Sequence, residues 1–345
     1  MVFAAIMGTK IVAPNVWGWI ADHTGKRMKI VRVASVLSLF CFVGIFVSQE
    51  YHWLLLVMIV FSFFWNANLP QFEAVTLSHL GKETHKYSSI RLWGSLGFVL
   101  LVMLLGAFFE YYSVELLPVV LMFLLAGILF FSFLVPEYSY HHEQDGENEF
   151  KKKLFSPEVL MFFLICFLLQ ASHGPYYAFY SVYLEQNGYS RTLIGQLWAL
   201  GVIAEILIFL VMHRLMPLFG PFRLLIICLL LTSLRWFLIA VYVDSFAVIL
   251  FAQSLHAASF GIFHAVAIHQ IHRYFPGKMQ GRGQALYSSI SFGAGGAIGA
   301  IYSGWVWEGY GAAWVYSVAG VIGVAALICA FIYKGMNKDS QAGNY

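Results

Sequence analysis

Residues 18–27 read Gly-Trp-Ile-Ala-Asp-His-Thr-Gly-Lys-Arg and stand between two long apolar segments, 1–21 and 33–48. A membrane-spanning helix needs about 20 mostly apolar residues, and both segments approach that length. The stretch between them holds the basic pair Lys26 and Arg27 and a glycine that permits a tight turn. This order of apolar segment, basic turn and apolar segment predicts two helices that cross a membrane in succession.

The same alternation continues over the whole chain. It has 345 residues, of which 60% are hydrophobic and 11% are charged, whereas soluble domains carry about 25% charged residues. No soluble core could bury so much apolar surface, so the composition predicts an all-α protein that crosses a membrane many times. Eleven windows of spanning length follow one another: 1–21, 33–48, 53–79, 88–109, 115–136, 157–184, 192–213, 223–242, 246–270, 284–305 and 312–334.

The basic residues indicate the orientation of these windows. The loops on one side hold only Arg191. Because loops rich in Lys and Arg stay in the cytoplasm, we expect the first window to run from outside to inside and the C-terminus to be cytoplasmic. The other basic loops lie around 22–32, 81–91, 151–153, 214–223 and 273–282, and a basic tail starts at Lys334.

A short repeat divides the chain into two halves. The tetrapeptide Tyr-Ser-Ser-Ile at 87–90 recurs at 287–290, six windows later. Such a repeat is typical of transporters built from two parallel six-helix halves. We therefore expect an N-terminal bundle at 1–136, a flexible cytoplasmic linker at 137–156, a C-terminal bundle at 157–334 and a cytoplasmic tail at 335–345.

The two halves differ in their number of windows. The loops at Gly25 and Gly220 correspond to each other in the repeat, which pairs the first window with the seventh. The window 157–184 then has no counterpart in the first half. We expect twelve helices in the full-length protein, with helix 1 missing, so that 1–136 holds helices 2–6 and 157–334 holds helices 7–12.

Charged side chains inside the windows point to a functional site. One charge at the centre of a spanning helix costs about 2.5–3.5 kcal/mol, so it needs a partner or a water-filled cavity. Glu73 and Arg91 lie at similar depths on successive windows, and a long arginine side chain can reach across to the glutamate. Charges of this kind are Lys10, Glu73, Arg91, Glu205 and Arg235.

Polar stripes on the later windows predict a cavity for a solute. Gln253, His256 and Ser259 are spaced by three residues and share one helix face. Polar side chains and aromatic rings on an apolar helix suit a solute-binding cavity. Further candidates for substrate binding are His173, Tyr177, Trp198 and, from the first half, Lys10.

Residues 18–27 resemble the loop signature of the major facilitator family, in which glycine, alanine-aspartate, glycine and two basic residues follow one another. The counterpart at 214–223 lacks the aspartate. The glycines suit a tight turn and a close approach of helices, and an aspartate can accept charge-assisted hydrogen bonds. The resemblance implies a cytoplasmic gate made by Gly18, Asp22, Gly25, Lys26 and Arg27.

Other segments look like narrower branches of that family. Residues 66–74 and 91–98 resemble helices 4 and 5 of the lactose permease branch. Residues 170–179 and 197–205 resemble helices 7 and 8 of the 3-phenylpropionate permease family. The likeness covers nearly the whole chain, and it implies a major facilitator fold in a bacterial inner membrane, with a central cavity that opens alternately to each side.

The resemblance also implies roles for single residues of the first half. Glu73 and Arg91 would form an ion pair that contacts the substrate. Phe98 occupies the position where the lactose permease branch has a sugar-stacking tryptophan. These three residues are expected to bind the solute.

In the second half, the resemblance implies a coupling network of Glu205, Arg235 and His256. One position departs from the pattern, because Ser259 stands where lactose permease has its proton-carrying glutamate. A buried glutamate holds a proton more readily than an exposed one, and histidine titrates near neutrality. The proton is therefore expected on Glu205 or His256.

Together these features predict a proton-coupled importer of a small organic solute, in first place an aromatic carboxylate such as 3-phenylpropionate. A sugar or nucleoside symporter of the same fold stays open, because the pair Glu73 and Arg91 resembles a sugar clamp. Drug efflux and a non-transporting membrane sensor also stay open. We expect no enzyme activity, cofactor, metal site or nucleic-acid partner. The expected partners are the solute, protons and the lipid bilayer, with the chain as a monomer.

Overall fold

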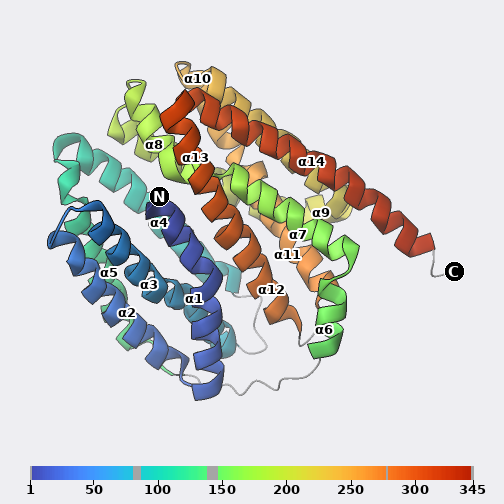
Figure 1. Ribbon diagram of the computed structural model, residues 1–345, viewed down its shortest axis with the longest axis horizontal. Helices are drawn as coiled ribbons and strands as arrows, with labels where there is room; N and C mark the ends of the chain where they lie inside the picture. Colours follow the sequence, from blue (N-terminus) through green and yellow to red (C-terminus); the bar gives the residue numbers. More distant parts are fainter. Residues whose placement is uncertain (1, 81–86, 138–146, 277–278, 343–345) are drawn as a thin grey trace. The chain divides into compact units, whose positions relative to one another are not determined.

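The computed structural model describes residues 2–80, 87–137, 147–276 and 279–342, apart from some side chains. Within these ranges the regular structure is helical throughout, and no strand occurs (Figure 1). The side chains outside the description are those of residues 22, 87–89, 91, 147–148 and 337–342.

Each of the eleven predicted windows falls mainly within helical segments of this description. The N-terminal helices are α1 (Val2–Thr24), α2 (Arg27–Val43), η1 (Gly44–Phe46), α3 (Tyr51–Leu80), α4 (Tyr87–Tyr111), η3 (Val114–Leu116) and α5 (Leu117–Leu134). The next are α6 (Glu147–Leu154), α7 (Pro157–Ser172), α8 (Gly174–Gln186), α9 (Arg191–Val241) and α10 (Phe246–Ser254). The last are η4 (Ala257–Ile262), α11 (Phe263–Tyr274), α12 (Gln280–Ser288), η6 (Ser289–Gly295), α13 (Gly296–Tyr310) and α14 (Ala312–Ala342). The prediction of an all-α membrane protein is therefore confirmed.

Eight helical segments of the described chain are long and apolar enough to cross a membrane. One of them, α9, has 51 residues and would be about 76 Å long as a straight rod, more than twice the hydrocarbon thickness. Gly220 interrupts it with φ 73° and ψ 157°, between Pro217 and Pro221. The two windows that the sequence separated by a loop at 214–223 are therefore joined through a single non-helical residue.

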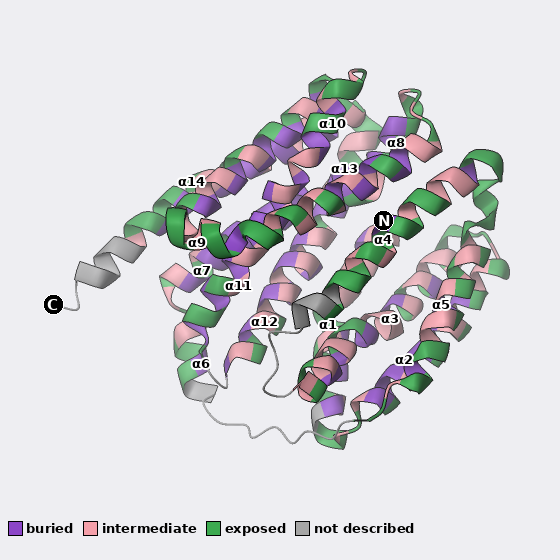
Figure 2. Ribbon diagram, turned by 180° about the vertical axis from the view of Figure 1, so that it is seen from behind, coloured by how far each residue is buried: buried purple, intermediate pink, exposed green. Residues whose placement is uncertain are grey.

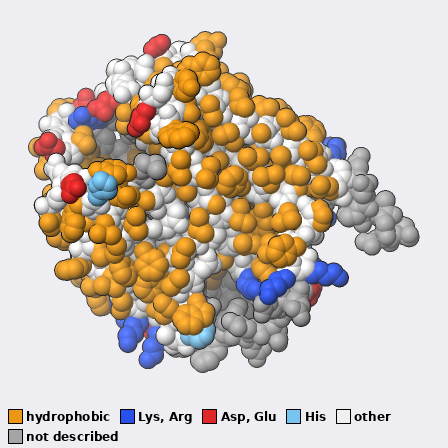
Figure 3. Space-filling view, in the orientation of Figure 1, with side chains coloured by type: hydrophobic (Ala, Val, Ile, Leu, Met, Phe, Trp, Pro, Cys, Tyr) orange, Lys and Arg blue, Asp and Glu red, His pale blue; other side chains and the backbone are white. Residues whose placement is uncertain are grey.

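The face drawn in Figure 3 is mostly apolar where its residues are described, as a lipid environment requires. Large side chains such as Phe123 and Trp305 are 75% and 81% exposed. The spans differ in burial: 11% of an apolar 18-residue window in Val114–Leu134 is buried, but 72% of such a window in Pro157–Gln186 (Figure 2). The later helices thus form the better-packed core.

Unit 1, which consists of Met1–Trp93 and Tyr112–Gln144, is one of two compact parts of the chain. Its helix α3 packs against α1 and α2, and α2 also packs against α5. The Glu137 carboxylate accepts hydrogen bonds from the backbone N–H groups of Met28 and Lys29 at 2.9 and 3.0 Å. This is the contact that a helix N-terminus favours, so residues after α5 cap the start of α2.

Unit 2 consists of Gly94–Tyr111 and Asp145–Tyr345. In it α14 packs against α7 and α9. A Cβ atom at Gly295 would lie 2.7 Å from the carbonyl oxygen of Phe167, and one at Gly299 would lie 2.6 Å from that of Ala171. These two glycines therefore let the backbones of two helical segments approach closely.

A second close contact joins α4 to the start of α9 inside unit 2. A Cβ atom at Gly195 would collide with the carbonyl oxygen of Val102, and one at Gly106 would lie 2.9 Å from that of Arg191. Arg191 also donates to the carbonyl oxygen of Phe109 at 2.9 Å. Gly94–Tyr111 thus groups with the later helices; the bundle boundary at residue 136 rests on the sequence repeat and stays a prediction.

The second half of the expected linker contains the helix α6. Phe150 is buried there, with its ring centroid 4.9 Å from that of Phe275. The guanidinium of Arg282 lies 4.1 Å from the centroid of the Phe150 ring. These aromatic and cation–π contacts anchor this part of the linker to unit 2. Burial of the large apolar ring of Phe150 stabilises the attachment.

Candidate functional site

Arg235 is the centre of a buried polar cluster in unit 2. Its side chain is fully buried on the second part of α9. Nη1 donates to His256 Nδ1 at 3.1 Å and to Ser259 Oγ at 3.0 Å, and Nη2 donates to Gln253 Oε1 at 3.1 Å. These acceptors come from one face of α10 and η4, as their spacing in the sequence predicted. Three acceptors offset the cost of a cation inside the membrane.

Aromatic rings enclose the guanidinium of Arg235. Its Cζ lies 4.3 Å from the ring centroid of Tyr176 and 4.5 Å from that of Trp236. The hydroxyl of Tyr176 accepts a hydrogen bond from Gln253 Nε2 at 2.7 Å, and Trp236 Nε1 donates to Ser172 Oγ at 3.1 Å. Cation–π contacts of a desolvated arginine are worth up to about 2 kcal/mol. In this conformation Arg235 is occupied by protein groups and presents no face to a solute.

The contacts of His256 determine which of its nitrogens carries hydrogen. Arginine can only donate hydrogen bonds, so Nδ1 of His256 must accept from Arg235 with its lone pair. The hydrogen of the neutral ring is then on Nε2, which lies 3.7 Å from Glu205 Oε2. The side chain of Glu205 is 18% exposed and that of His256 is 7% exposed. Of the two expected proton carriers, Glu205 is the one that water reaches more readily.

Two glycines let α9 approach the polar stripe closely. A Cβ atom at Gly201 would lie 2.8 Å from Gln253 Nε2, and one at Gly261 would lie 2.5 Å from Ile208 Cγ2. Residues 257–262 form a π-helical turn, a rare feature that is frequent at functional sites. This local geometry brings Glu205 within reach of His256.

The predicted substrate residues of unit 2 differ in accessibility. His173 is fully buried, its Nδ1 lies 2.9 Å from the carbonyl oxygen of Leu169, and its ring packs on Trp236 at 4.9 Å. Tyr177 is 39% exposed. Trp198 is half-buried and donates from Nε1 to Ser181 Oγ at 3.0 Å. Tyr177 and Trp198 can therefore touch a solute in this conformation, whereas His173 packs against Trp236 of the Arg235 cluster and is not accessible.

The candidate residues of the first half lie on three different helices. Glu73 is half-buried on α3, and Lys10 is half-buried on α1. The backbone of Arg91 lies in α4, but its side chain is outside the described residues, so the expected pair with Glu73 stays a prediction. Phe98 is 42% exposed on the part of α4 that belongs to unit 2.

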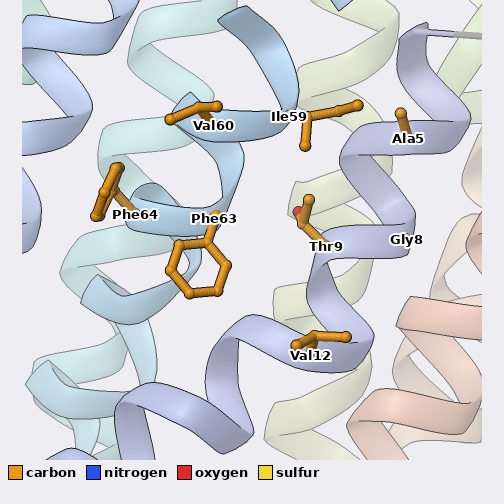
Figure 4. Close-up of a pocket in the computed structure, with 8 residues that line it drawn as sticks. All are labelled: Ala5, Gly8, Thr9, Val12, Ile59, Val60, Phe63 and Phe64. Carbon is orange, nitrogen blue, oxygen red and sulfur yellow. The ribbon is translucent and has the colours of Figure 1, made fainter. Parts of the chain in front are cut away.

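A separate pocket of about 450 Å³ in unit 1 contains none of the predicted site residues. It lies between α1 and α3 and is lined by apolar groups, with the Thr9 hydroxyl as the one polar side chain among them (Figure 4). That hydroxyl donates to the carbonyl oxygen of Ile6 and accepts from Asn66 Nδ2. Its polar group is already used, so the pocket lacks the convergent polar groups of a solute site.

The predicted gate loop forms the turn between α1 and α2. Gly25 has φ +65°, a conformation that other residues rarely adopt. Arg27 donates from Nη1 to Gln71 Oε1 on α3 at 2.9 Å, and Lys26 is exposed. At Gly18 a Cβ atom would meet no described atom within 4 Å. The side chain of Asp22 lies outside the described residues, so its role stays a prediction.

Comparison with models of known protein families shows which family the chain belongs to. The model of the MFS_1 like family matches residues 1–318. The chain belongs to this family. It is therefore a multi-pass membrane transporter of the major facilitator type that binds small-molecule solutes, and the predicted resemblance and the absence of an enzyme function are confirmed.

Curated relatives of this MFS_1 like transporter are also transporters. It is 27% identical over 324 residues to the "Probable 3-phenylpropionic acid transporter" of Escherichia coli (strain K12). The alignment covers 91% of this chain and 83% of the relative. It is 24% identical over 325 residues to the maltose permease of Geobacillus stearothermophilus, with 92% and 82% covered.

Solved structures agree with this family at the level of the fold. A single-residue mutant of the nucleoside transporter NupG superposes with a TM-score of 0.84 at 16% identity and covers 97% of this chain and 89% of its own. A mutant of the peptide transporter POT gives 0.75 at 14% identity, with 97% and 85% covered. At such identities the likeness establishes the fold of this transporter and no more.

Sequence reasoning missed two members of the Arg235 cluster in this transporter. Trp236 and Ser172 belong to it, but they read in the sequence as ordinary residues of apolar spans. An intramembrane arginine followed directly by tryptophan is a usable signal, because arginine favours an aromatic face when it is desolvated. Ser172 had no signal, since serine is common in spanning helices.

Proposed function

We propose that this transporter imports a small organic solute together with protons, and that the solute is an aromatic carboxylate such as 3-phenylpropionate. The observation that carries the proposal is the 3.7 Å contact of the Glu205 carboxylate with Nε2 of His256, whose other nitrogen is occupied by Arg235. A carboxylate that is partly exposed, beside a buried cation, can alternate between an ionised and a protonated state.

Glu205 is the proton carrier in this proposal. Protonation of His256 would place a hydrogen on Nδ1 and break its hydrogen bond with Arg235, whereas protonation of Glu205 leaves that bond intact. An anionic solute that enters with a proton carries less net charge across the membrane, which lowers the electrostatic cost of transport.

The name of the Escherichia coli relative supports the choice of an aromatic carboxylate. The exposed rings of Phe98 and Tyr177 and the half-buried ring of Trp198 suit an aromatic group. Because Arg235 is occupied, Lys10 or Arg91 is left to receive the carboxylate. Glu73 and Arg91 remain proposed as the solute-contacting pair of the first half.

Uptake into proteoliposomes tests this proposal. Labelled 3-phenylpropionate should accumulate when the outside is acidic, and a protonophore should abolish accumulation. The Glu205→Gln variant should lose accumulation driven by the gradient but keep exchange of labelled for unlabelled solute, because exchange needs no net proton release. Glu115→Gln, a change at an exposed residue of η3, is the matched control. Uptake at the same rate with and without a proton gradient would overturn the proposal.

A sugar or nucleoside is the second candidate solute. It is favoured by the likeness to a maltose permease in sequence and to a nucleoside transporter in fold. Competition of 3-phenylpropionate uptake with maltose and with uridine separates the candidates, since only a true solute should compete at micromolar to millimolar concentration.

We propose further that the transporter is a monomer in the bacterial inner membrane with a cytoplasmic C-terminus. The alternation of basic loops supports this orientation. A fluorescent protein or a phosphatase fused to the C-terminus tests it, because the first is expected to be bright and the second inactive on the cytoplasmic side. An active phosphatase would reverse the orientation.

A further inference from the structure

Three rings stand in line on one face of unit 2, next to the coupling residues. The ring of Phe260 lies 5.5 Å from that of His256 at an interplanar angle of 15°, and 5.9 Å from that of His264 at 7°. The three residues are four positions apart. The helix between His256 and His264 contains the π-helical turn at 257–262. The i to i+5 hydrogen bonds of such a turn widen it, so that residues four positions apart lie closer to the same helix face. We call this set the ring ladder.

Other aromatic side chains surround the ring ladder without closing it. The ring of Phe292 from η6 lies 6.3 Å from Phe260 and 6.5 Å from His264. Phe209 from α9 meets His264 at 6.5 Å and is 38% exposed. Phe260, His264 and Phe292 are half-buried. These rings stack on or tilt against one another, and their outer edges are partly accessible.

The ring ladder is unsuited to face lipid. It begins at His256, which touches the Glu205 carboxylate, and it ends at His264, whose Nδ1 lies 3.4 Å from the Tyr287 hydroxyl. Ionisable side chains inside the membrane face the protein interior or a water-filled space, because lipid cannot solvate them. The open surface of Phe260 shares its helix face with both histidines, so it faces the same space.

We propose that a planar aromatic ring of the solute packs against the exposed edge of Phe260, which lies between the near-parallel rings of His256 and His264 and beside the tilted ring of Phe292. Offset or edge-on ring contacts add about 0.5–1.5 kcal/mol beyond burial, which corresponds to about 2- to 12-fold in affinity. A saturated ring of similar size keeps the apolar burial but lacks the π face. The inference rests on the proposed function and specifies its solute as one with a flat ring.

Two pairs of probes test the ring ladder by binding to the purified, intact chain, measured by titration calorimetry. 3-Phenylpropionate and 3-cyclohexylpropionate share the carboxylate and the chain and differ in the planarity of the ring. Uridine and maltose form a second pair, with and without a flat ring. The wild type should bind the planar member of at least one pair, with a preference of about 2- to 12-fold over the non-planar member.

Three variants complete the test. Phe260→Leu should weaken binding of the planar member more than binding of the non-planar member and so remove this preference, whereas Phe260→Tyr should retain the preference. Phe179→Leu is the matched control, because Phe179 stacks on Trp307 at 4.7 Å and 17° on another pair of helices of unit 2. Its loss should not alter the preference. Thermal unfolding of each variant checks that it is folded.

The outcomes separate the inference from the proposed function. If uridine but no phenyl compound binds in a way that depends on Phe260, the ring ladder is supported as a binding surface and an aromatic carboxylate is ruled out as the solute. If the phenyl compound binds but Phe260→Leu weakens both members of its pair equally, or no more than Phe179→Leu does, the ring ladder is overturned and the proposed solute stands. Binding of neither planar probe by the wild type overturns both.

Discussion

Nη1 of Arg235 donates a hydrogen bond to Nδ1 of His256 at 3.1 Å, and this bond holds His256 as a neutral ring with its hydrogen on Nε2. The pair joins a buried cation on α9 to the helix face that also meets Glu205. An acceptor in this position cannot take up a proton without losing its donor. The first two predictions follow from this relationship.

His256→Gln should still transport when driven by a proton gradient. A glutamine can accept from Arg235 with its amide oxygen and donate toward Glu205 with its amide nitrogen, but it cannot titrate. We expect initial uptake rates within about 10-fold of the wild type, which corresponds to about 1.4 kcal/mol. Complete loss of driven uptake with exchange intact would instead make His256 the carrier.

Arg235→Lys should be strongly destabilising although the charge is kept. An ammonium is a compact point charge and cannot make the three hydrogen bonds and the two ring contacts of the planar guanidinium at once. Partners left unpaired cost about 1–3 kcal/mol each, and thermal unfolding in detergent measures the loss. Arg214→Lys, at an exposed position of α9, is the control, and equal stability of the two variants would contradict the enclosed role of Arg235.

Gly195→Ala should separate α4 from α9. The new Cβ atom would collide with the carbonyl oxygen of Val102, a backbone atom that cannot rotate away. Overpacking of this kind costs about 1–3 kcal/mol. Gly304→Ala in α13 is the control, because its Cβ atom meets no described atom within 4 Å, and alanine there should stabilise by up to about 1 kcal/mol. Thermal unfolding that ranks the two variants the other way would refute this packing.

Gly25→Ala should destabilise the turn between α1 and α2, whereas Gly18→Ala should not. Gly25 has φ +65°, where an alanine is strained by about 1–2 kcal/mol. Gly18 is helical and its surroundings are open, so alanine is tolerated. Limited proteolysis at Lys26 measures the opening of the turn, and equal cleavage rates of the two variants would show that the turn needs no glycine. Gly25→Asn should lie between them, since asparagine tolerates positive φ.

The apolar windows of the sequence located the spanning helices of the described chain, but neither the short helix α6 nor every connection. The loop expected at 214–223 is a single break at Gly220, because the helix continues through charged residues once its apolar face is packed. The linker expected at 137–156 includes α6, whose buried residue Phe150 is anchored by Phe275 and Arg282. Such contacts between distant residues leave no periodic pattern in the sequence.

For the site, residue spacing predicted which side chains share a helix face, but it did not predict which residues of other helices contact them. Gln253, His256 and Ser259 were placed on one face from their intervals, and they accept from Arg235 together. Trp236 and Ser172 joined the cluster only in the structure. The intervals report on a known helical period, whereas the partner across the gap depends on the rotation and crossing of a second helix.

The sequence by itself determined that this protein is a many-helix membrane transporter, because windows of about 20 apolar residues and a repeat of two halves leave few other architectures. Only the tertiary structure decided that Arg235 is sealed between protein groups, that His256 is a neutral acceptor and that Phe260 lies half-buried between two near-parallel histidine rings. The physical reason is that hydropathy acts locally along the chain, whereas a hydrogen bond or a ring contact requires two distant segments to meet within about 3–6 Å.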